Sequence, residues 1–255
     1  VTSVFFRSLY NYHTGRHLGA NLRIPESFML SSVVTAGNSV FPANPGASFR
    51  AIYMKRVHAL PYSYFASSMA LYAIITTLLM LLFCVLLVLL IQIKQDHFRG
   101  DLLLFLPIIA FFAFLFLVWR QRPIDSDNRT IWSSLTASFL GLVGAGKLVA
   151  TSLMIVTSNF IVISVVWVVV LREYSPELSI LEASLFAASQ IVSGLINLTP
   201  GAAGFQELVG IYVGQSFQFP TIELVAILIW VRLVRVLASV AIGIPSAIIL
   251  HLRSH

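Results

Sequence analysis

The sequence is poor in charge, and this scarcity decides the class of protein. Only 10% of its 255 residues are Asp, Glu, Lys or Arg, while 58% are hydrophobic and the mean hydropathy is +0.90. Soluble domains carry roughly 25% charged residues. A chain so short of charge cannot cover a water-facing surface, so lipid is its expected solvent. We therefore predict an all-α, polytopic membrane protein that forms a single transmembrane domain over residues 1–255.

Patterns that support catalysis are also scarce. The one cysteine, Cys84, excludes an internal disulfide. The histidines show no His-x-x-x-His or Glu-x-x-His spacing for a metal, and there is no Gly-x-Ser-x-Gly elbow or P-loop. We expect no metal, no cofactor and no enzymatic activity. The net charge of +6 would suggest nucleic acid in a soluble protein, but basic loops that anchor a membrane protein explain it here, and we expect no nucleic-acid partner.

Long apolar runs are what the sequence has in abundance. A transmembrane helix needs about 20 predominantly apolar residues. Residues 1–24 mix aromatic and basic side chains, which is typical of an interfacial segment, and the Gly-punctuated residues 131–146 predict an interfacial helix. The expected spanning helices cover residues 61–93, 102–119, 148–171 and 221–250.

Two further segments, 27–59 and 179–217, are apolar but interrupted. The first contains Asn38-Ser-Val-Phe-Pro-Ala-Asn-Pro-Gly46, and the second contains Asn197-Leu-Thr-Pro-Gly-Ala-Ala-Gly204. Proline and glycine in these positions end a helix. We interpret each segment as a re-entrant hairpin of two short helices with its broken tip inside the membrane. A long span follows each, which indicates an inverted repeat of the kind that transporters use to build a binding site.

The distribution of basic residues supports opposite entry of the two hairpins. If the first hairpin opens to the cytoplasm, eleven lysines and arginines fall on the cytoplasmic side and three (Lys94, Arg99 and Arg172) fall outside. This asymmetry satisfies the positive-inside rule. The assignment depends on residues 131–146 not crossing the bilayer.

Arg232 and Arg235 lie within the last predicted span, and a spacing of three places them on one helix face. An arginine near the bilayer centre costs at least about 2.5–3.5 kcal/mol on insertion scales, so the pair must face protein, water or an anion. One interpretation is phosphate binding by the guanidinium forks. The other is a structural ion pair with Glu207 or Glu223.

The two broken tips supply the other candidate residues. Asn38 and Asn197 are expected either to cap exposed backbone or to contact a ligand. The backbone N–H groups of Gly201 and Gly204 precede a short helix and either assist anion binding or serve close packing. Glu207 either favours that helix N-terminus or neutralises Arg232.

Arg50 completes the candidate set. It follows the first tip, and it either lines the cytoplasmic mouth of a cavity or anchors in the headgroup layer.

The two tip motifs, followed by Trp230-Val-Arg232-Leu, resemble the signatures of the lysylphosphatidylglycerol synthase transmembrane family over residues 5–250. That family usually carries Pro-Gly-Gly-x-Gly-x-Arg-Glu at its second tip. Here Gln206 precedes Glu207, Ala47 follows the first tip's glycine where an acidic residue is common, and residues 67–70 replace a charged pattern. The sequence has no match to the family's soluble synthase domain, so we expect a stand-alone member. It also has no match to the helices that usually precede the first tip motif, so we expect that the chain has lost its N-terminus.

The resemblance implies a flippase-like protein of the bacterial or archaeal cytoplasmic membrane. Its expected partner is a phospholipid with an anionic or aminoacylated headgroup, moved between leaflets through a polar cavity between the hairpins. The alternative is a non-catalytic scaffold or subunit for a separate lipid synthase or glycosyltransferase. A homodimer is also compatible with the sequence.

Overall fold

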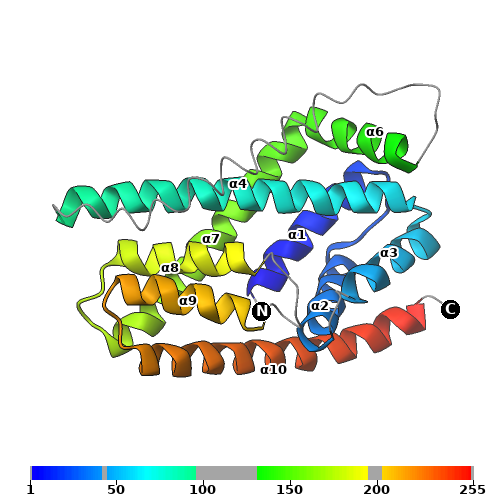
Figure 1. Cartoon of the computed structure of the whole chain (residues 1–255). Helices are drawn as coiled ribbons and strands as arrows, with labels where there is room; N and C mark the ends of the chain where they lie inside the picture. Colours follow the sequence, from blue (N-terminus) through cyan, green and yellow to red (C-terminus); the bar gives the residue numbers. More distant parts are fainter. Residues whose placement is uncertain (1, 42–44, 96–130, 195–202, 254–255) are drawn as a thin grey trace.

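The computed structural model describes residues 2–41, 45–95, 131–194 and 203–253 (Figure 1). Within these ranges the chain forms α-helices joined by short turns, with no strand. The helices are α1 (Thr2–His17), α2 (Ile24–Val40), α3 (Pro45–His58), α4 (Tyr62–Gln95), α6 (Ile131–Gly144), α7 (Gly146–Tyr174), α8 (Ile180–Ser193), α9 (Phe205–Ser216) and α10 (Thr221–Arg253).

Three helices in the described ranges are long and apolar enough to cross a bilayer. They are α4 over Tyr62–Ile93, α7 over Gly146–Tyr174 and α10 over Thr221–Leu252. At about 1.5 Å per residue each exceeds the roughly 30 Å hydrocarbon core. Their outer faces expose large apolar side chains, among them Met154 at 72% and Leu237 at 60%. Water would penalise such a surface and lipid accepts it, so the prediction of an all-α membrane protein is confirmed.

Four of the shorter helices form two pairs, α2–α3 and α8–α9. Local sequence signals mark the start of each pair. Pro25 occupies the first turn of α2, where a missing N–H is harmless. In α8, the Ser179 hydroxyl accepts the N–H of Glu182 at 3.2 Å, and the Glu182 carboxylate accepts the N–H of Ser179 at 2.9 Å. This reciprocal capping box fixes the point at which the second pair begins.

The two pairs are arranged in opposite senses. Helices α4 and α10 run along opposite edges of the molecule in opposite chain directions, with α8 and α9 between them (Figure 1). The α2–α3 pair opens toward the start of α4, and the α8–α9 pair opens toward the start of α10. The closed ends of both pairs therefore face the middle of the molecule, where α2 packs along α10.

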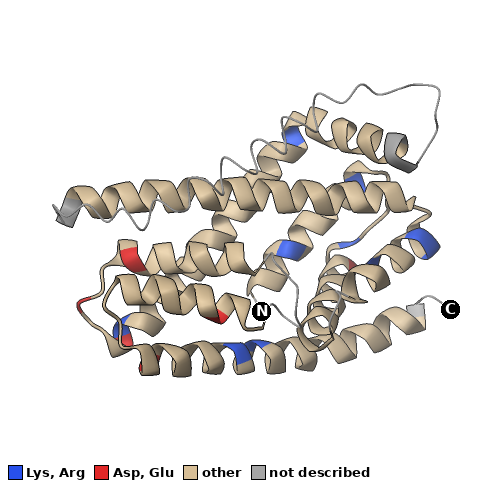
Figure 2. Cartoon of the chain, in the orientation of Figure 1, with Lys and Arg blue, Asp and Glu red and all other residues tan. Residues whose placement is uncertain are grey.

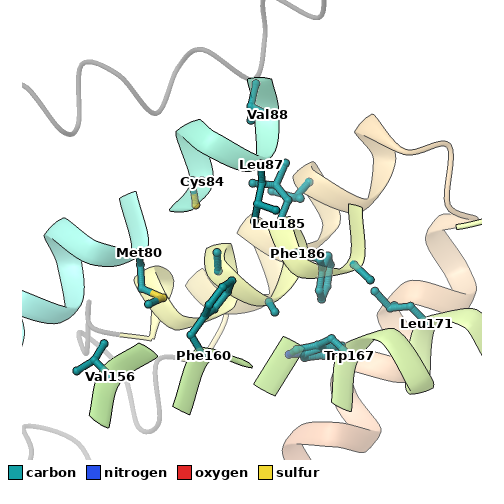
Figure 3. Packing of buried hydrophobic residues seen from close by; sticks show 14 of the residues in the cluster. Met80, Cys84, Leu87, Val88, Val156, Phe160, Trp167, Leu171, Leu185 and Phe186 are labelled. Carbon is teal, nitrogen blue, oxygen red and sulfur yellow. The ribbon is translucent and has the colours of Figure 1, made fainter. Parts of the chain in front are cut away.

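The core lies between α4, α7 and α8 (Figure 3). Phe83 stacks on Phe160 with ring centroids 4.6 Å apart, and the rings of Trp167 and Phe186 meet in a T-shaped arrangement with centroids 4.8 Å apart. Small residues such as Ala187 are fully buried on α8 and let the helices approach closely. Because lipid tails are as apolar as these side chains, close packing rather than escape from water holds such helices together.

Gly243 sets the distance between α10 and α2. A Cβ built there would lie 2.4 Å from the Cβ of Ala36 and 3.1 Å from the carbonyl oxygen of Ser32. We expect Gly243→Val to destabilise the fold by about 1–3 kcal/mol, because the added side chain forces two packed helices apart. Thermal unfolding in detergent can be followed with a thiol-reactive dye, since Cys84 is the chain's one cysteine and is fully buried.

The matched control is Gly141→Val, because nothing lies within 4 Å of a Cβ at Gly141. Equal unfolding temperatures for the two variants would contradict the packing that the structure assigns to Gly243.

Glu26 joins the open ends of α2 and α3. Its Oε1 accepts the Tyr53 hydroxyl at 2.7 Å and lies 2.9 Å from Nε2 of His58. Burial raises the pKa of this carboxyl, but the hydrogen bonds from Tyr53 and His58 outweigh that effect and hold the pKa below its ordinary value of 4.5.

Because the folded-state pKa of Glu26 lies below its unfolded value, its carboxylate stabilises the fold above pH 4.5. That contribution is lost as the pH falls through the folded-state pKa. We expect the unfolding temperature of Glu26→Gln to fall less than that of the wild type between about pH 5 and pH 3. Glu223→Gln, an exposed site on α10, should keep the wild-type slope. Parallel curves for all three proteins would refute the assignment.

The structure reaches most, but not all, of the expected segments. The expected span at 102–119 lies outside the described residues. The predicted interfacial helix ends at Gly144, and α7 begins at Gly146 after a break at Ala145. The entry of the two helix pairs into the membrane, and their relation as an inverted repeat, belong to the proposal below.

Candidate functional site

A polar cavity of about 110 Å³ lies where the closed ends of both helix pairs meet the middle of α10. Helix α1 contributes Arg7, and the end of α2 contributes Thr35, Asn38 and Ser39. The remaining lining residues are Gly194 at the end of α8, Gln206 on α9, and Arg232, Arg235 and Val236 on α10. Residues more than 200 positions apart in the sequence thus share one polar space.

Glu207 organises the start of α9. Gly204 has φ +82°, a conformation that glycine adopts readily, and its N–H donates to Glu207 Oε2 at 2.7 Å. The other carboxylate oxygen, Oε1, accepts Nη1 of Arg232 and forms an ion pair with it. Glu207 therefore contacts the N-terminus of α9 and pairs with Arg232 at the same time, as the two expected roles require. The Gly204 N–H is already used by this carboxylate, so the expected role of that N–H as a phosphate donor does not fit the geometry.

Gln206 holds the second pair closed and also reaches α10. Its Nε2 donates to the Gln190 carbonyl at 2.8 Å, and Nε2 of Gln190 donates to the Gln206 carbonyl at 3.2 Å. These reciprocal bonds tie α8 to α9. The remaining amide oxygen of Gln206 accepts Nη1 of Arg235 at 3.1 Å.

The two arginines of α10 therefore differ in their charge partners. Arg232 is ion-paired with Glu207, whereas the partner of Arg235 is a neutral amide. Within the described ranges no carboxylate forms an ion pair with Arg235. Its guanidinium keeps a full positive charge at the cavity and retains donors for a ligand.

Asn38 closes the first helix pair. Its Oδ1 accepts the N–H of Gly46 at 2.9 Å, which joins the end of α2 to the start of α3. This contact is the capping role expected of Asn38. Asn38 also lines the cavity, together with Arg235. The end of α2 therefore lies at the same cavity as the arginines of α10.

The cavity carries a net positive charge. Among its described residues, Arg7, Arg232 and Arg235 supply three positive charges, and the carboxylate of Glu207 beside them supplies one negative charge, leaving +2. Figure 2 shows basic residues in the middle of α10, away from its ends. Guanidinium groups bind phosphate through paired N–H donors, and Asn38, whose amide uses only its oxygen to accept the Gly46 N–H, lines the same cavity. The arrangement is suited to a phosphate-bearing headgroup.

The expected site residues are only partly brought together. Arg232, Arg235 and Asn38 line the cavity. Glu207 is linked to it through the ion pair with Arg232, and the Gly204 N–H donates to Glu207. Arg50 does not join them; it is 8% exposed and lines a separate small cavity between α1, α3 and α4. Asn197 and Gly201 lie outside the described residues.

Sequence reasoning missed Arg7, Gln206 and two hydroxyl residues. Thr35, Asn38 and Ser39 share one face of α2 by their spacing, which is a signal that was available. Arg7, Asn11 and Thr14 are spaced in the same way on α1, and the last two are buried. From the sequence alone, Arg7 is one of the basic residues in the predicted interfacial segment 1–24, and Gln206 is a departure from the second tip motif.

The fold and the site together define a helical membrane protein with a cationic cavity where the α2–α3 and α8–α9 pairs meet α10. The family model described as "Lysylphosphatidylglycerol synthase TM region" matches residues 1–243, and the chain belongs to this family. No curated protein and no solved structure shows a significant match. Directly before Glu207, the neutral amide oxygen of Gln206 accepts Arg235.

Proposed function

We propose that this chain is a flippase-like translocase that moves a phospholipid between leaflets, with the headgroup passing through the cavity of Arg7, Arg232 and Arg235. The single observation that carries the proposal is the position of this cavity. The cavity has a net charge of +2 and lies at the middle of α10, an apolar helix long enough to span the bilayer. A headgroup cannot cross hydrocarbon unaided, because its charge and hydrogen-bonding groups would lose water without replacement.

The two helix pairs are proposed to enter the membrane without crossing it. Helices α2, α3, α8 and α9 have 17, 14, 14 and 12 residues. At about 1.5 Å per residue they cover roughly 18–26 Å, less than the hydrocarbon thickness of about 30 Å. Pairs of this length that open in opposite directions place their closed ends near the middle of the bilayer. Broken helices of this kind are tolerated at depth only where they line protein or a polar cavity.

The cavity charge favours an anionic headgroup over an aminoacylated one. An aminoacyl group adds a positive charge, which Arg7 and Arg235 would repel. Glu207 is the carboxylate beside the described cavity residues, and it is already paired with Arg232. The resemblance of the two tip motifs implies charged residues at the positions where this sequence has Ala47 and Gln206. We therefore propose that the substrate is an anionic phospholipid and that the chain moves it without a chemical reaction.

The proposal is tested by lipid movement in proteoliposomes. The purified chain is reconstituted into vesicles that contain a fluorescent phosphatidylglycerol or its lysyl derivative, and a membrane-impermeant reagent then reports which leaflet holds the label. We expect phosphatidylglycerol to exchange between leaflets faster in these vesicles than in empty ones. In the same vesicles the lysyl derivative should exchange more slowly than phosphatidylglycerol.

Two outcomes would overturn the proposal in different ways. Folded protein that moves neither lipid would remove the translocase function, and a synthase or glycosyltransferase that co-purifies in a fixed ratio would then support the scaffold alternative. Faster movement of the lysyl derivative would keep the translocase and refute the headgroup preference.

A further inference from the structure

A groove of about 270 Å³ lies between the end of α7 and the start of α10. Both helices are long and apolar enough to span the bilayer, and Ile222 and Trp230 at the groove are 87% and 65% exposed. The groove therefore opens on a surface that faces lipid. Its apolar lining consists of Val170, Ile222, Ala226, Ile227, Trp230 and Val231, and its polar lining of Tyr174 and Glu223.

The groove and the headgroup cavity lie on different faces of α10. Ile222, Ala226 and Trp230 follow one another at a spacing of four, so they share one side of the helix. Arg232 follows Trp230 by two positions, which at 3.6 residues per turn rotates it by about 200° around the helix axis. A molecule in the groove therefore does not occupy the headgroup cavity.

The groove has the length of one leaflet and a polar end. From Ile222 to Val231, α10 advances about 14 Å at roughly 1.5 Å per residue, and half of a hydrocarbon core of about 30 Å is about 15 Å. Tyr174 is the last residue of α7, and Glu223 lies in the first turn of α10. Tyrosine is typical of the membrane surface. The polar end thus lies at headgroup level, and the apolar lining extends from it into the hydrocarbon.

An acyl chain is the occupant that fits this shape. Helices α7 and α10 are not among the closely packed helix pairs in the described part of the chain, and an empty groove would leave its lining without van der Waals partners. A helix with its side chains is about 10–12 Å across, so it would rest on the rim. A single lipid chain is thinner and more flexible, and it can fill the groove from the bilayer.

Glu223 gives the groove a charge preference. The sequence allowed Glu223 as a partner for Arg232, but Arg232 is paired with Glu207. Among the residues that the structure describes, Glu223 forms no ion pair. Its carboxylate is therefore available to a cationic group at the polar end of the groove.

The protein around this end is acidic as well. Arg172, Glu173 and Glu177 at the end of α7 and in the turn after it carry a net charge of −1, and Glu223 brings the total to −2. Figure 2 shows acidic residues at the end of the molecule where α7 ends and α10 begins. This charge attracts a positively charged headgroup and repels an anionic one.

The ammonium of an ethanolamine headgroup meets this requirement. It carries a positive charge and N–H donors for a carboxylate, whereas choline has no N–H and a glycerol headgroup has no positive charge. We propose that the α7–α10 groove binds phosphatidylethanolamine, with one acyl chain along the apolar lining and the amine at Glu223. This lipid stays bound at the side of the protein, so the inference does not rest on the proposed function.

The test uses lipids with bromine on their acyl chains, because bromine quenches tryptophan fluorescence at short range. The full chain is placed in nanodiscs that contain equal amounts of phosphatidylethanolamine and phosphatidylglycerol, with one or the other brominated. The difference between wild type and Trp230→Phe isolates Trp230 among the four tryptophans. Brominated phosphatidylethanolamine should occupy the site beside Trp230 about threefold more often than brominated phosphatidylglycerol, as expected for one solvent-exposed ion pair.

Three variants make the result specific. Glu223→Gln removes the charge and should bring the occupancy ratio of the two lipids close to one. Glu173→Gln removes a carboxylate that is exposed on α7 and does not line the groove, so it should keep the wild-type ratio. Ala226→Phe, at an exposed site in the groove, should lower the quenching of Trp230 by both lipids. Protection of Cys84 from a thiol dye shows that each variant is folded.

Equal quenching of wild type by both lipids would overturn the inference, because ordinary boundary lipid gives that result. A preference that survives Glu223→Gln or Ala226→Phe would also overturn it. Weak quenching by both lipids together with a dimer in the nanodisc would assign the groove to a second copy of the chain. Movement between leaflets enters none of these measurements, so this inference and the proposed function can fail separately.

Discussion

Arg235→Met is expected to slow the movement of phosphatidylglycerol in proteoliposomes by at least about tenfold. One hydrogen bond between a charged donor and a phosphate contributes about 1.5–3 kcal/mol, and about 1.4 kcal/mol corresponds to a factor of ten in rate. Arg235 is the critical arginine because its partner in the cavity is the neutral amide of Gln206, whereas Arg232 is ion-paired with Glu207. Leaflet exchange of fluorescent lipid measures the effect directly.

The control for this variant is Arg172→Met at the exposed end of α7, which lies outside the cavity. It carries the same change of charge and side chain and should exchange lipid at the wild-type rate. Unchanged burial of Cys84 in both variants shows that the fold is intact. An Arg235→Met protein that is folded and moves lipid as fast as wild type would exclude Arg235 from the headgroup path.

Glu207→Gln is expected to lower the free energy of unfolding by about 1–3 kcal/mol, because it leaves Arg232 without its carboxylate. Fully buried pairs lose about 3–5 kcal/mol when one partner is removed. The value expected here is smaller because the Arg232 and Glu207 side chains are 26% and 22% exposed. Glutamine can still accept the Gly204 N–H, so the change isolates the ion pair from the helix cap.

A double-mutant cycle supplies the control for the ion pair. Removing both charges, in Glu207→Gln with Arg232→Gln, should recover part of the lost stability, with a coupling energy of about 1–2 kcal/mol. Thermal unfolding followed at Cys84 measures all four proteins. Effects that simply add would show that Arg232 and Glu207 do not depend on each other.

Much of the architecture followed from the sequence because its signals are local. Runs such as 61–93 and 221–250 are long and uniformly apolar, and proline and glycine after Asn38 interrupt a helix whatever surrounds them. The helix spacing of Arg232 and Arg235 likewise needs no tertiary information. Glu207 could be named as the partner of Arg232, although Glu223 could not be excluded, since choosing between them requires the path of α9 across α10.

The cavity itself could not be predicted from the sequence, because it depends on which faces of distant helices meet. Arg7 resembles an interfacial anchor until α1 is seen to pack against α2 and α7. Gln206 looked like the loss of a charge, and only the structure shows its amide bridging α8, α9 and Arg235. The position of Arg50 after the first tip predicts a place at the cavity mouth or in the headgroup layer, but the packing of α3 against α4 places it in a different cavity.

The most direct test of the central claim is mass spectrometry of the lipid that co-purifies with the protein. The chain, Arg235→Met and Arg172→Met would be expressed in a membrane that contains both phosphatidylglycerol and its lysyl derivative. Wild type and Arg172→Met should retain phosphatidylglycerol in preference to the lysyl form, and Arg235→Met should lose most of it. Equal lipid content in all three proteins would contradict the assignment of this cavity as a headgroup site.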